Sequence, residues 1–192
     1  MNTDLWREIG EHVDQRRLDA AIDRLESRLA ACASSRFKNL LAGDFTNEPA
    51  SIAAHLNDFI AFCEAKFPVQ AVYLEMNGFD INVDLWYFDS FGYKRYVDTS
   101  DDLEWLPYWN SANYPIVPLT GLEAVQREYD WYSNHGGYKD TAARTAADLA
   151  SLLVMCRFGR LISRAVATQK VKRHLPILAS AHDFDIIPKF WS

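Results

Sequence analysis

The sequence predicts one α+β domain in which helices pack on one face of a small antiparallel β-meander. Apolar residues recur at helical spacing through residues 1–67 and again from residue 120 to residue 168. Between these helical parts, residues 68–97 alternate apolar and polar side chains, as strands do when one sheet face is buried. The 192 residues hold no internal repeat, low-complexity run or linker, so a single domain is the economical interpretation.

The first helical part is expected to contain a break. Apolar residues from Leu5 to Val13 share one helix face, whereas those from Leu18 to Leu29 share a nearly opposite face. One straight helix would present these two stripes to opposite sides. We therefore infer a break or bend near residues 14–15.

A further helix is expected to start at Pro49, because proline suits the first helical turn, where its missing N–H has no helical acceptor. An apolar stripe runs from Ile52 to Phe67, and Pro68 ends it. His55 borders this stripe. We expect it to be a hydrogen-bonded interfacial histidine rather than a metal ligand.

The meander is expected to begin with a tight hairpin. The dipeptide Asn77-Gly78 lies between two alternating runs and favours a two-residue type I′ turn. That turn would place Glu75 directly opposite Asp80, and like charges in this position destabilise a hairpin. A second turn is expected at residues 89–92 and a third strand at 93–97.

Residues 98–119 are expected to form an ordered acidic aromatic loop, because they contain too many aromatic side chains for disorder. Thr120 and Glu123 then have the spacing of a capping box, which predicts a helix start. The last long helix is expected over residues 140–168. Residues 169–192 are interpreted as a C-terminal tail with one short strand at 184–187.

Composition excludes several classes of function. The net charge of −6 argues against attraction to nucleic acid or to an anionic membrane. There is neither a signal-peptide pattern nor an apolar run of membrane-spanning length, so we expect a cytoplasmic protein.

The three cysteines lack CxxC spacing, which argues against a disulfide framework or a zinc site, and Cys63 and Cys156 are expected to be buried. No nucleotide-binding or hydrolase motif is present, so no catalytic residue, metal ligand or cofactor is assigned.

The most informative feature is an acidic, aromatic segment. Residues 75–104 contain eight acidic residues and only two basic ones, interleaved with aromatic side chains. A one-signed field raises the rate of association with an oppositely charged protein, and aromatic anchors slow dissociation. The candidate partner-binding residues are Glu75, Asp80, Asp84, Trp86, Asp89, Asp101, Asp102, Glu104 and Trp105.

Two other interpretations of these carboxylates stay open. The face is an ordinary solvated one if Lys94 or Arg95 from the third strand offsets the repulsion. Alternatively, Asp80, Asn82 and Asp84 alternate along one strand and so project from one face near Glu75, an arrangement of oxygen ligands that suits Mg²⁺ or Ca²⁺.

A basic stretch follows from residue 157 to residue 173, where Arg157, Arg160 and Arg164 share one helix face. Nucleic-acid binding is one interpretation. We favour a solvated face or internal pairing with the acidic loop, because the helix dipole also favours cations near a helix C-terminus.

The acidic aromatic segment and the helix entry that follows it resemble bacterial immunity proteins of polymorphic-toxin and contact-dependent inhibition systems. The resemblance covers about a quarter of the chain. The residues that carry it are Asn77, Gly78, Phe79, Asp80, Trp86, Asp89, Asp101, Asp102, Trp105 and the entry Leu119-Thr120-Gly121. It implies a protein that binds one cognate toxin, often a nuclease with a basic cleft, and blocks it without catalysis.

The first hypothesis is therefore a non-enzymatic immunity or inhibitor protein that neutralises a basic bacterial toxin through its acidic aromatic surface. The alternative is a cytosolic enzyme that uses the carboxylates of the 75–84 hairpin to bind a divalent metal or a substrate.

Overall fold

The fold is described from a computed structural model, which describes residues 3–14, 17–79, 82–97, 105–168, 171, 174–184 and 189–191. The five helices are α1 (Thr3–Asp14), α2 (Leu18–Ala31), α3 (Pro49–Glu64), α4 (Glu123–Asn134) and α5 (Thr141–Ala167). Two 3₁₀ turns, η1 (Lys38–Ala42) and η2 (Gly137–Lys139), connect them. The five strands are β1 (Ala71–Met76), β2 (Tyr87–Tyr93), β3 (Val117–Pro118), β4 (Pro176–Ala181) and β5 (Lys189–Trp191).

The predicted α+β class is confirmed, but the sheet is mixed rather than an antiparallel meander. Its strand order is β3-β2-β1-β4-β5, and β1 pairs in parallel with β4. Residues 94–97 are not a strand; the outer neighbour of β2 is instead β3. The segment interpreted as a C-terminal tail supplies β4 and β5, and the strand expected at 184–187 falls largely outside the described residues.

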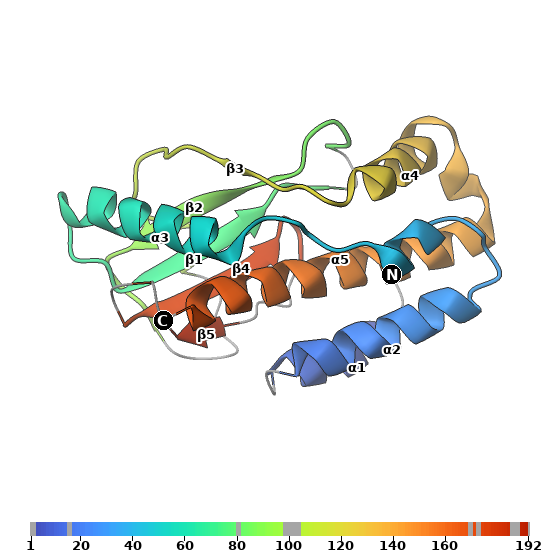
Figure 1. Ribbon diagram of the computed structural model, residues 1–192, viewed down its shortest axis with the longest axis horizontal. Helices are drawn as coiled ribbons and strands as arrows, with labels where there is room; N and C mark the ends of the chain where they lie inside the picture. Colours follow the sequence, from blue (N-terminus) through green and yellow to red (C-terminus); the bar gives the residue numbers. More distant parts are fainter. Residues whose placement is uncertain are drawn as a thin grey trace.

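Helix α5 is the longest helix and lies at the centre of the molecule (Figure 1). Its C-terminal half lies with α3 over one face of the sheet, while its N-terminal half packs between α2 and α4. The sequence explains this position, because residues 149–156 are apolar around almost the whole helix circumference and are nearly all buried. Of the described helices, none has the length and apolar character that crossing a bilayer requires.

Several predicted helix boundaries are confirmed. Helices α1 and α2 are separate, as the change of stripe indicated, and Pro49 occupies the first turn of α3. Helix α5 starts at its N-cap Asp140, whose side chain accepts hydrogen bonds from two backbone N–H groups of the first turn. Cys63 and Cys156 are buried and free, and burial raises the pKa of the Cys63 thiol to about 11.

The prediction of a capping box at the start of α4 is wrong in its hydrogen bonds. The Glu123 carboxylate accepts a hydrogen bond from the backbone N–H of Gly121 at 2.9 Å. The backbone N–H of Thr120 donates instead to the Asn47 side chain, also at 2.9 Å. The helix therefore begins near the expected residue, but its entry is held by a contact with the segment before α3.

The two-residue hairpin at Asn77-Gly78 does not form. Strand β1 pairs with β2 in a register that places Glu75 opposite Asp89, and residues 77–86 form the connection. The Asn77 side chain closes this connection, because it accepts a hydrogen bond from the backbone N–H of Tyr87 and donates one to the backbone carbonyl of Leu85.

Burial of two aromatic side chains explains the longer connection. Phe79 and Trp86 are both at most 1% exposed, and the Trp86 indole N–H donates to the Phe79 carbonyl at 3.1 Å. Both rings pack against Tyr129 of α4. A two-residue turn would hold Phe79 in the strand ladder, so core packing outweighs the local turn preference.

Candidate functional site

The sheet presents two faces of different character. Inward side chains such as Val72, Leu74 and Phe88 join the main core beneath α3 and α5. Alternate residues point to the opposite side. We call this side the outer face; its residues on β1, β2 and β4 are Tyr73, Glu75, Tyr87, Asp89, Phe91, Tyr93, Leu178 and Ser180.

One end of the outer face is an aromatic cluster covered by the segment after β2. Trp105 meets the ring of Tyr93 edge-on at a centroid distance of 4.8 Å, and the Tyr93 hydroxyl donates to the Leu106 carbonyl at 2.8 Å. Beside this cluster, Trp109 packs on Phe91 at 5.0 Å but stays 49% exposed. An accessible aromatic surface therefore continues from a buried one.

The other end of the outer face is acidic. Glu75 and Asp89 are directly opposite each other on β1 and β2. The pKa of Asp89 is raised by partial burial and by the negative charge of Glu75. Burial and the same Glu75 carboxylate also raise the pKa of the hydroxyls of Tyr73 and Tyr93. Burial is the larger cause of each shift, and the Glu75 charge adds to it.

A histidine after β4 contacts this acidic pair. His182 Nδ1 lies 2.7 Å from Glu75 Oε1, and the His182 side chain is 55% exposed. Lys94 and Arg95, the residues expected to offset the repulsion, are exposed and lie beyond the end of β2. Glu75 is therefore paired with an exposed imidazole, and within the described residues no ion pair joins Asp89 to a cation.

The predicted binding residues that the structure describes do not form one surface. Glu75 and Asp89 share the outer face, Trp105 lies half-buried at its aromatic end, and Asp84 is exposed in the connection before β2. Trp86 is only 1% exposed and belongs to the main core, so its assignment to the binding surface is wrong. The remaining four, Asp80, Asp101, Asp102 and Glu104, lie outside the described residues.

Four residues near this face are absent from the predicted set of binding residues. His182 and Ser180 belong to a segment interpreted as a tail, although the run PILASA is typical of a strand buried in a sheet. Exposed Trp109 and Tyr108 lie within the predicted aromatic loop, but only the tertiary structure brings Trp109 onto β2.

The divalent-metal interpretation gains no support from the geometry. Asp80 is outside the described residues, and the Asn82 side chain donates a local hydrogen bond to the Gly78 carbonyl. Across the described ranges, no three His, Cys, Asp or Glu side chains are grouped so that they could hold a metal ion.

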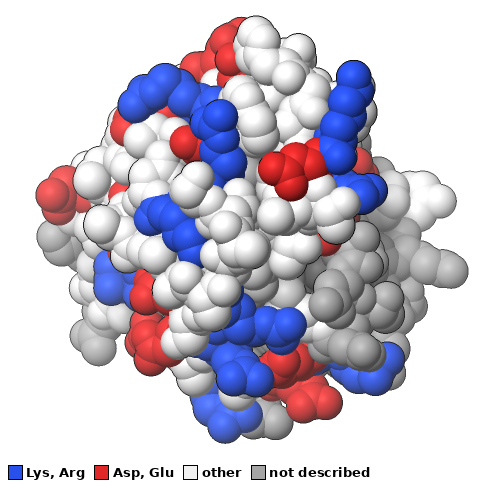
Figure 2. Space-filling view, turned by 90° about the vertical axis from the view of Figure 1, so that its right-hand side faces the viewer, with Lys and Arg blue, Asp and Glu red and all other residues white. Residues whose placement is uncertain are grey.

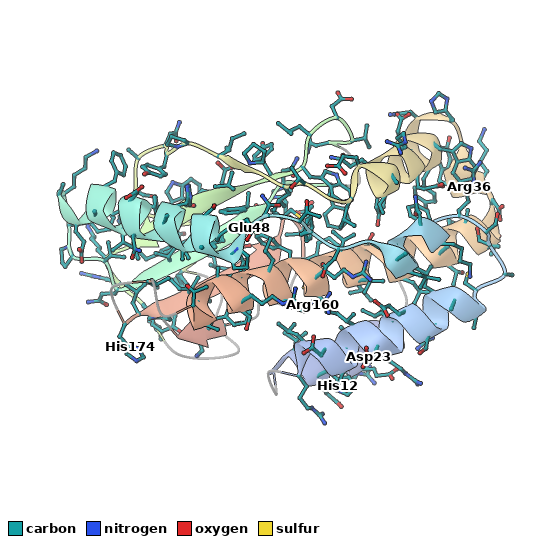
Figure 3. All side chains as sticks on the ribbon, viewed as in Figure 1. His12, Asp23, Arg36, Glu48, Arg160 and His174 are labelled. Atoms are coloured by element: carbon teal, nitrogen blue, oxygen red, sulfur yellow. The ribbon has the colours of Figure 1, made fainter. Side chains whose placement is uncertain are left out.

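The arginines of α5 pair internally, as favoured above, but their partners are not in the acidic loop. Arg157 contacts Glu26 of α2 at 2.5 Å. Arg160, labelled in Figure 3, contacts Asp44 at 2.6 Å, and Arg164 lies 3.7 Å from the same carboxylate. At the end of the molecule formed by α4, η2 and the start of α5, basic and acidic side chains are interspersed (Figure 2).

No protein-family model, curated protein or solved structure matches this chain, so its site is interpreted from its own geometry.

Proposed function

We propose that this protein binds a basic protein partner through the outer face of its sheet and neutralises that partner without catalysis, as an immunity protein blocks a cognate toxin. The observation that carries the proposal is the Glu75–Asp89 pair, two half-buried carboxylates directly opposite each other at one end of the outer face. Such a pair destabilises the free protein.

A cation from a partner would relieve this repulsion. A lysine or arginine side chain placed between Glu75 and Asp89 would form charge-assisted hydrogen bonds with both carboxylates. The Glu75 charge, which adds to the effect of burial in raising the pKa of Asp89, is then compensated in the complex. This accounts for acidic residues that weaken the isolated sheet.

The neighbouring aromatic side chains supply anchoring area. Phe91 follows Asp89 by two residues on β2, so both point to the outer face, and Trp109 packs on Phe91. Tyr108 is 76% exposed next to it. Exposed tryptophan and tyrosine beside charged residues are typical of binding hot spots.

The test uses the product of the reading frame adjacent to this one in the source genome. We expect that product to stop cell growth when it is expressed alone and to be harmless when this chain is co-expressed. We also expect the two purified proteins to bind directly. A harmless product, or toxicity without rescue, would overturn the proposed function.

Paired variants locate the binding surface. Glu75→Gln with Asp89→Asn should weaken the complex by about 10- to 100-fold, the range expected when charged hydrogen bonds are lost at an interface. The matched control is Asp23→Asn with Glu48→Gln, which removes the same charge from two exposed positions on the helical side of the molecule (Figure 3). Equal affinity for both double variants would remove the outer face from the proposal, even if binding itself is real.

A further inference from the structure

The backbone holds His182 at the acidic end of the outer face. Its backbone N–H donates to the Met76 carbonyl at 2.9 Å, at the point where the pairing of β4 with β1 ends. Its side chain follows Ser180 by two positions and so lies on the same side of the sheet. Nδ1 lies 2.7 Å from Glu75 Oε1. An imidazole is therefore held against one of the two carboxylates that are proposed to bind the partner's cation.

This contact determines where protons lie on the imidazole ring. A carboxylate only accepts hydrogen bonds, so Nδ1 carries a hydrogen and donates it to Glu75. A further proton is then taken up at Nε2, which lies 3.7 Å from Asp183 Oδ1. Imidazoles change charge between about pH 5 and pH 8. The cation formed in this range lies between two carboxylates.

The other ionisable groups at this end of the outer face are acidic or neutral. Asp89 lies opposite Glu75 on β2. The Tyr73 hydroxyl stays protonated, because burial raises its pKa and the Glu75 charge adds to this effect. Within the described residues, no lysine or arginine forms an ion pair with Glu75 or Asp89. Protonated His182 is therefore the protein's own cation at this carboxylate pair.

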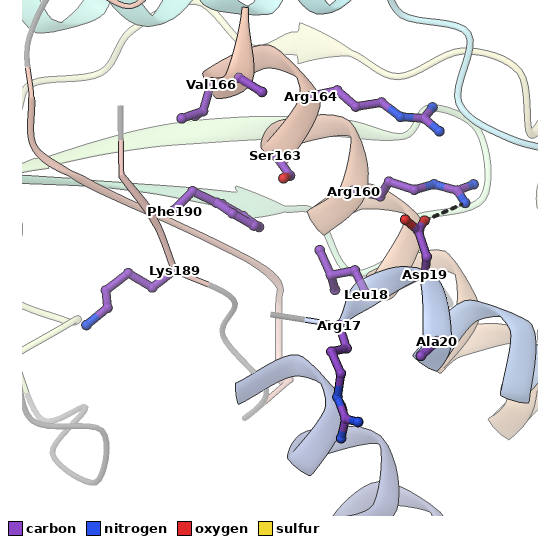
Figure 4. Close-up of a pocket in the computed structure, with 11 residues that line it drawn as sticks. Arg17, Leu18, Asp19, Ala20, Arg160, Ser163, Arg164, Val166, Lys189 and Phe190 are labelled. Atoms are coloured by element: carbon purple, nitrogen blue, oxygen red, sulfur yellow. Dashed lines mark hydrogen bonds and ion pairs between the residues drawn. The ribbon is translucent and has the colours of Figure 1, made fainter. Parts of the chain in front are cut away.

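The arginines around a cavity of about 600 Å³, where the start of α2, the C-terminal half of α5 and β5 meet, are engaged elsewhere. Arg160 contacts Asp44 at 2.6 Å and Asp19 at 3.4 Å, and Arg164 lies 3.7 Å from Asp44. The Arg17 guanidinium points away from those of Arg160 and Arg164 (Figure 4). These side chains do not compensate the acidic pair of the outer face.

Protonation of His182 changes what the acidic pair offers to a basic partner. The imidazolium compensates the charge of Glu75, and it would lie beside any lysine or arginine that the partner places there. A partner cation therefore binds more weakly to the protonated form, and its binding expels the proton from Nε2. Because such coupling is reciprocal, affinity rises as the pH increases through the titration range of the imidazole.

We propose that His182 regulates the outer face as a pH-dependent competitor for the partner's cation. At acidic pH the imidazolium occupies Glu75 and weakens the complex, and near neutral pH the uncharged ring leaves this carboxylate to the partner. The inference rests on the proposed function, because it takes the partner's cation to bind at Glu75.

The affinity of the full chain for the product of the adjacent reading frame tests this regulation, measured by calorimetry at pH 7.5 and at pH 5.5. Glu75 is 27% exposed, so its pair with the imidazolium lies between exposed and buried ion pairs in strength. The wild type should therefore lose about three- to tenfold more affinity at pH 5.5 than His182→Gln does, because glutamine keeps a hydrogen-bond donor without a titratable charge. Titration of the partner itself affects both proteins equally.

His135→Gln is the matched control. His135 lies at the C-terminal end of α4 and forms a comparable exposed pair, with Nε2 at 3.5 Å from Asp130 Oδ2. This variant should keep the pH dependence of the wild type. A change equal to that of His182→Gln would show a general charge effect and overturn the assignment to His182.

Failure of this inference is distinguishable from failure of the proposed function. Absence of binding at both pH values would overturn the proposed function and this inference with it. Binding with the same pH dependence in the wild type and in His182→Gln would overturn this inference alone. Nuclear magnetic resonance of the free chain gives a second readout, in which Glu75→Gln should lower the pH midpoint of the His182 ring signals but not that of His135. An unchanged His182 midpoint would show that Glu75 does not hold the imidazolium, and would also overturn the inference.

Discussion

Removal of the Glu26 carboxylate should destabilise the protein more than removal of the arginine that it pairs with. Arg157 lies in the buried middle of α5, and its side chain is only 2% exposed. One Nη donates to Glu26 Oε1 and the other to the Leu40 carbonyl, both at 2.5 Å. Its Nε has no acceptor. Glu26 is thus the only anion paired with this guanidinium among the described residues.

The expected magnitudes follow from these exposures. Breaking a buried ion pair costs about 3–5 kcal/mol, because one charge is left without a partner. Glu26 is 33% exposed, so water can partly replace its carboxylate, and Glu26→Ala should cost about 3 kcal/mol, at the low end of that range. Arg157→Met removes the buried charge itself and leaves mainly the Leu40 carbonyl without this donor, at about 1–2 kcal/mol.

Urea unfolding followed by circular dichroism measures both values, and thermal unfolding provides a second readout. For a chain of this size, a loss of 3 kcal/mol lowers the melting temperature by about 6–12 °C. Arg24→Met is the control, because Arg24 is 54% exposed and its ion pair with Glu8 should contribute less than about 1 kcal/mol. If Arg157→Met proves more destabilising than Glu26→Ala, then the buried charge does not control stability here and the reasoning is wrong.

Two more changes test the backbone and the outer face. Gly121→Ala should destabilise the fold by about 3 kcal/mol, because φ is +104° and the new Cβ would lie 2.3 Å from the Asp44 carbonyl oxygen. Gly136→Ala is the control: its φ is +81°, but a new Cβ there would meet open space. It should therefore cost clearly less in the same urea assay. The raised pKa of Asp89 means that the folded state binds a proton there more tightly than the unfolded chain, so stability falls as pH rises from the ordinary value of 3.8 through the raised pKa. Asp89→Asn should therefore raise the melting temperature of the free protein above that pKa and lose this advantage below pH 3.8. A gain that is equal at every pH would contradict the raised pKa of Asp89.

Glu75 and Asp89 show what local sequence patterns can and cannot predict about a binding surface. Both were recognised as candidate binding residues, because acidic residues among aromatics stand out in any sequence. Their partners were assigned wrongly. Glu75 was expected opposite Asp80, but the register pairs it with Asp89, and His182 contacts it from a strand-end more than one hundred positions away.

The sequence by itself determined the α+β class, the break between α1 and α2, the start of α3 at Pro49 and the extent of α5. These features depend on apolar periodicity, prolines and caps within a few residues of one another, and such signals are local. Only the tertiary structure decided the sheet order, the inward burial of Trp86 and the acidic pair with its histidine. Each of these joins segments far apart in the chain, where burial of aromatic side chains and long-range strand pairing outweigh a local turn preference such as that of Asn77-Gly78.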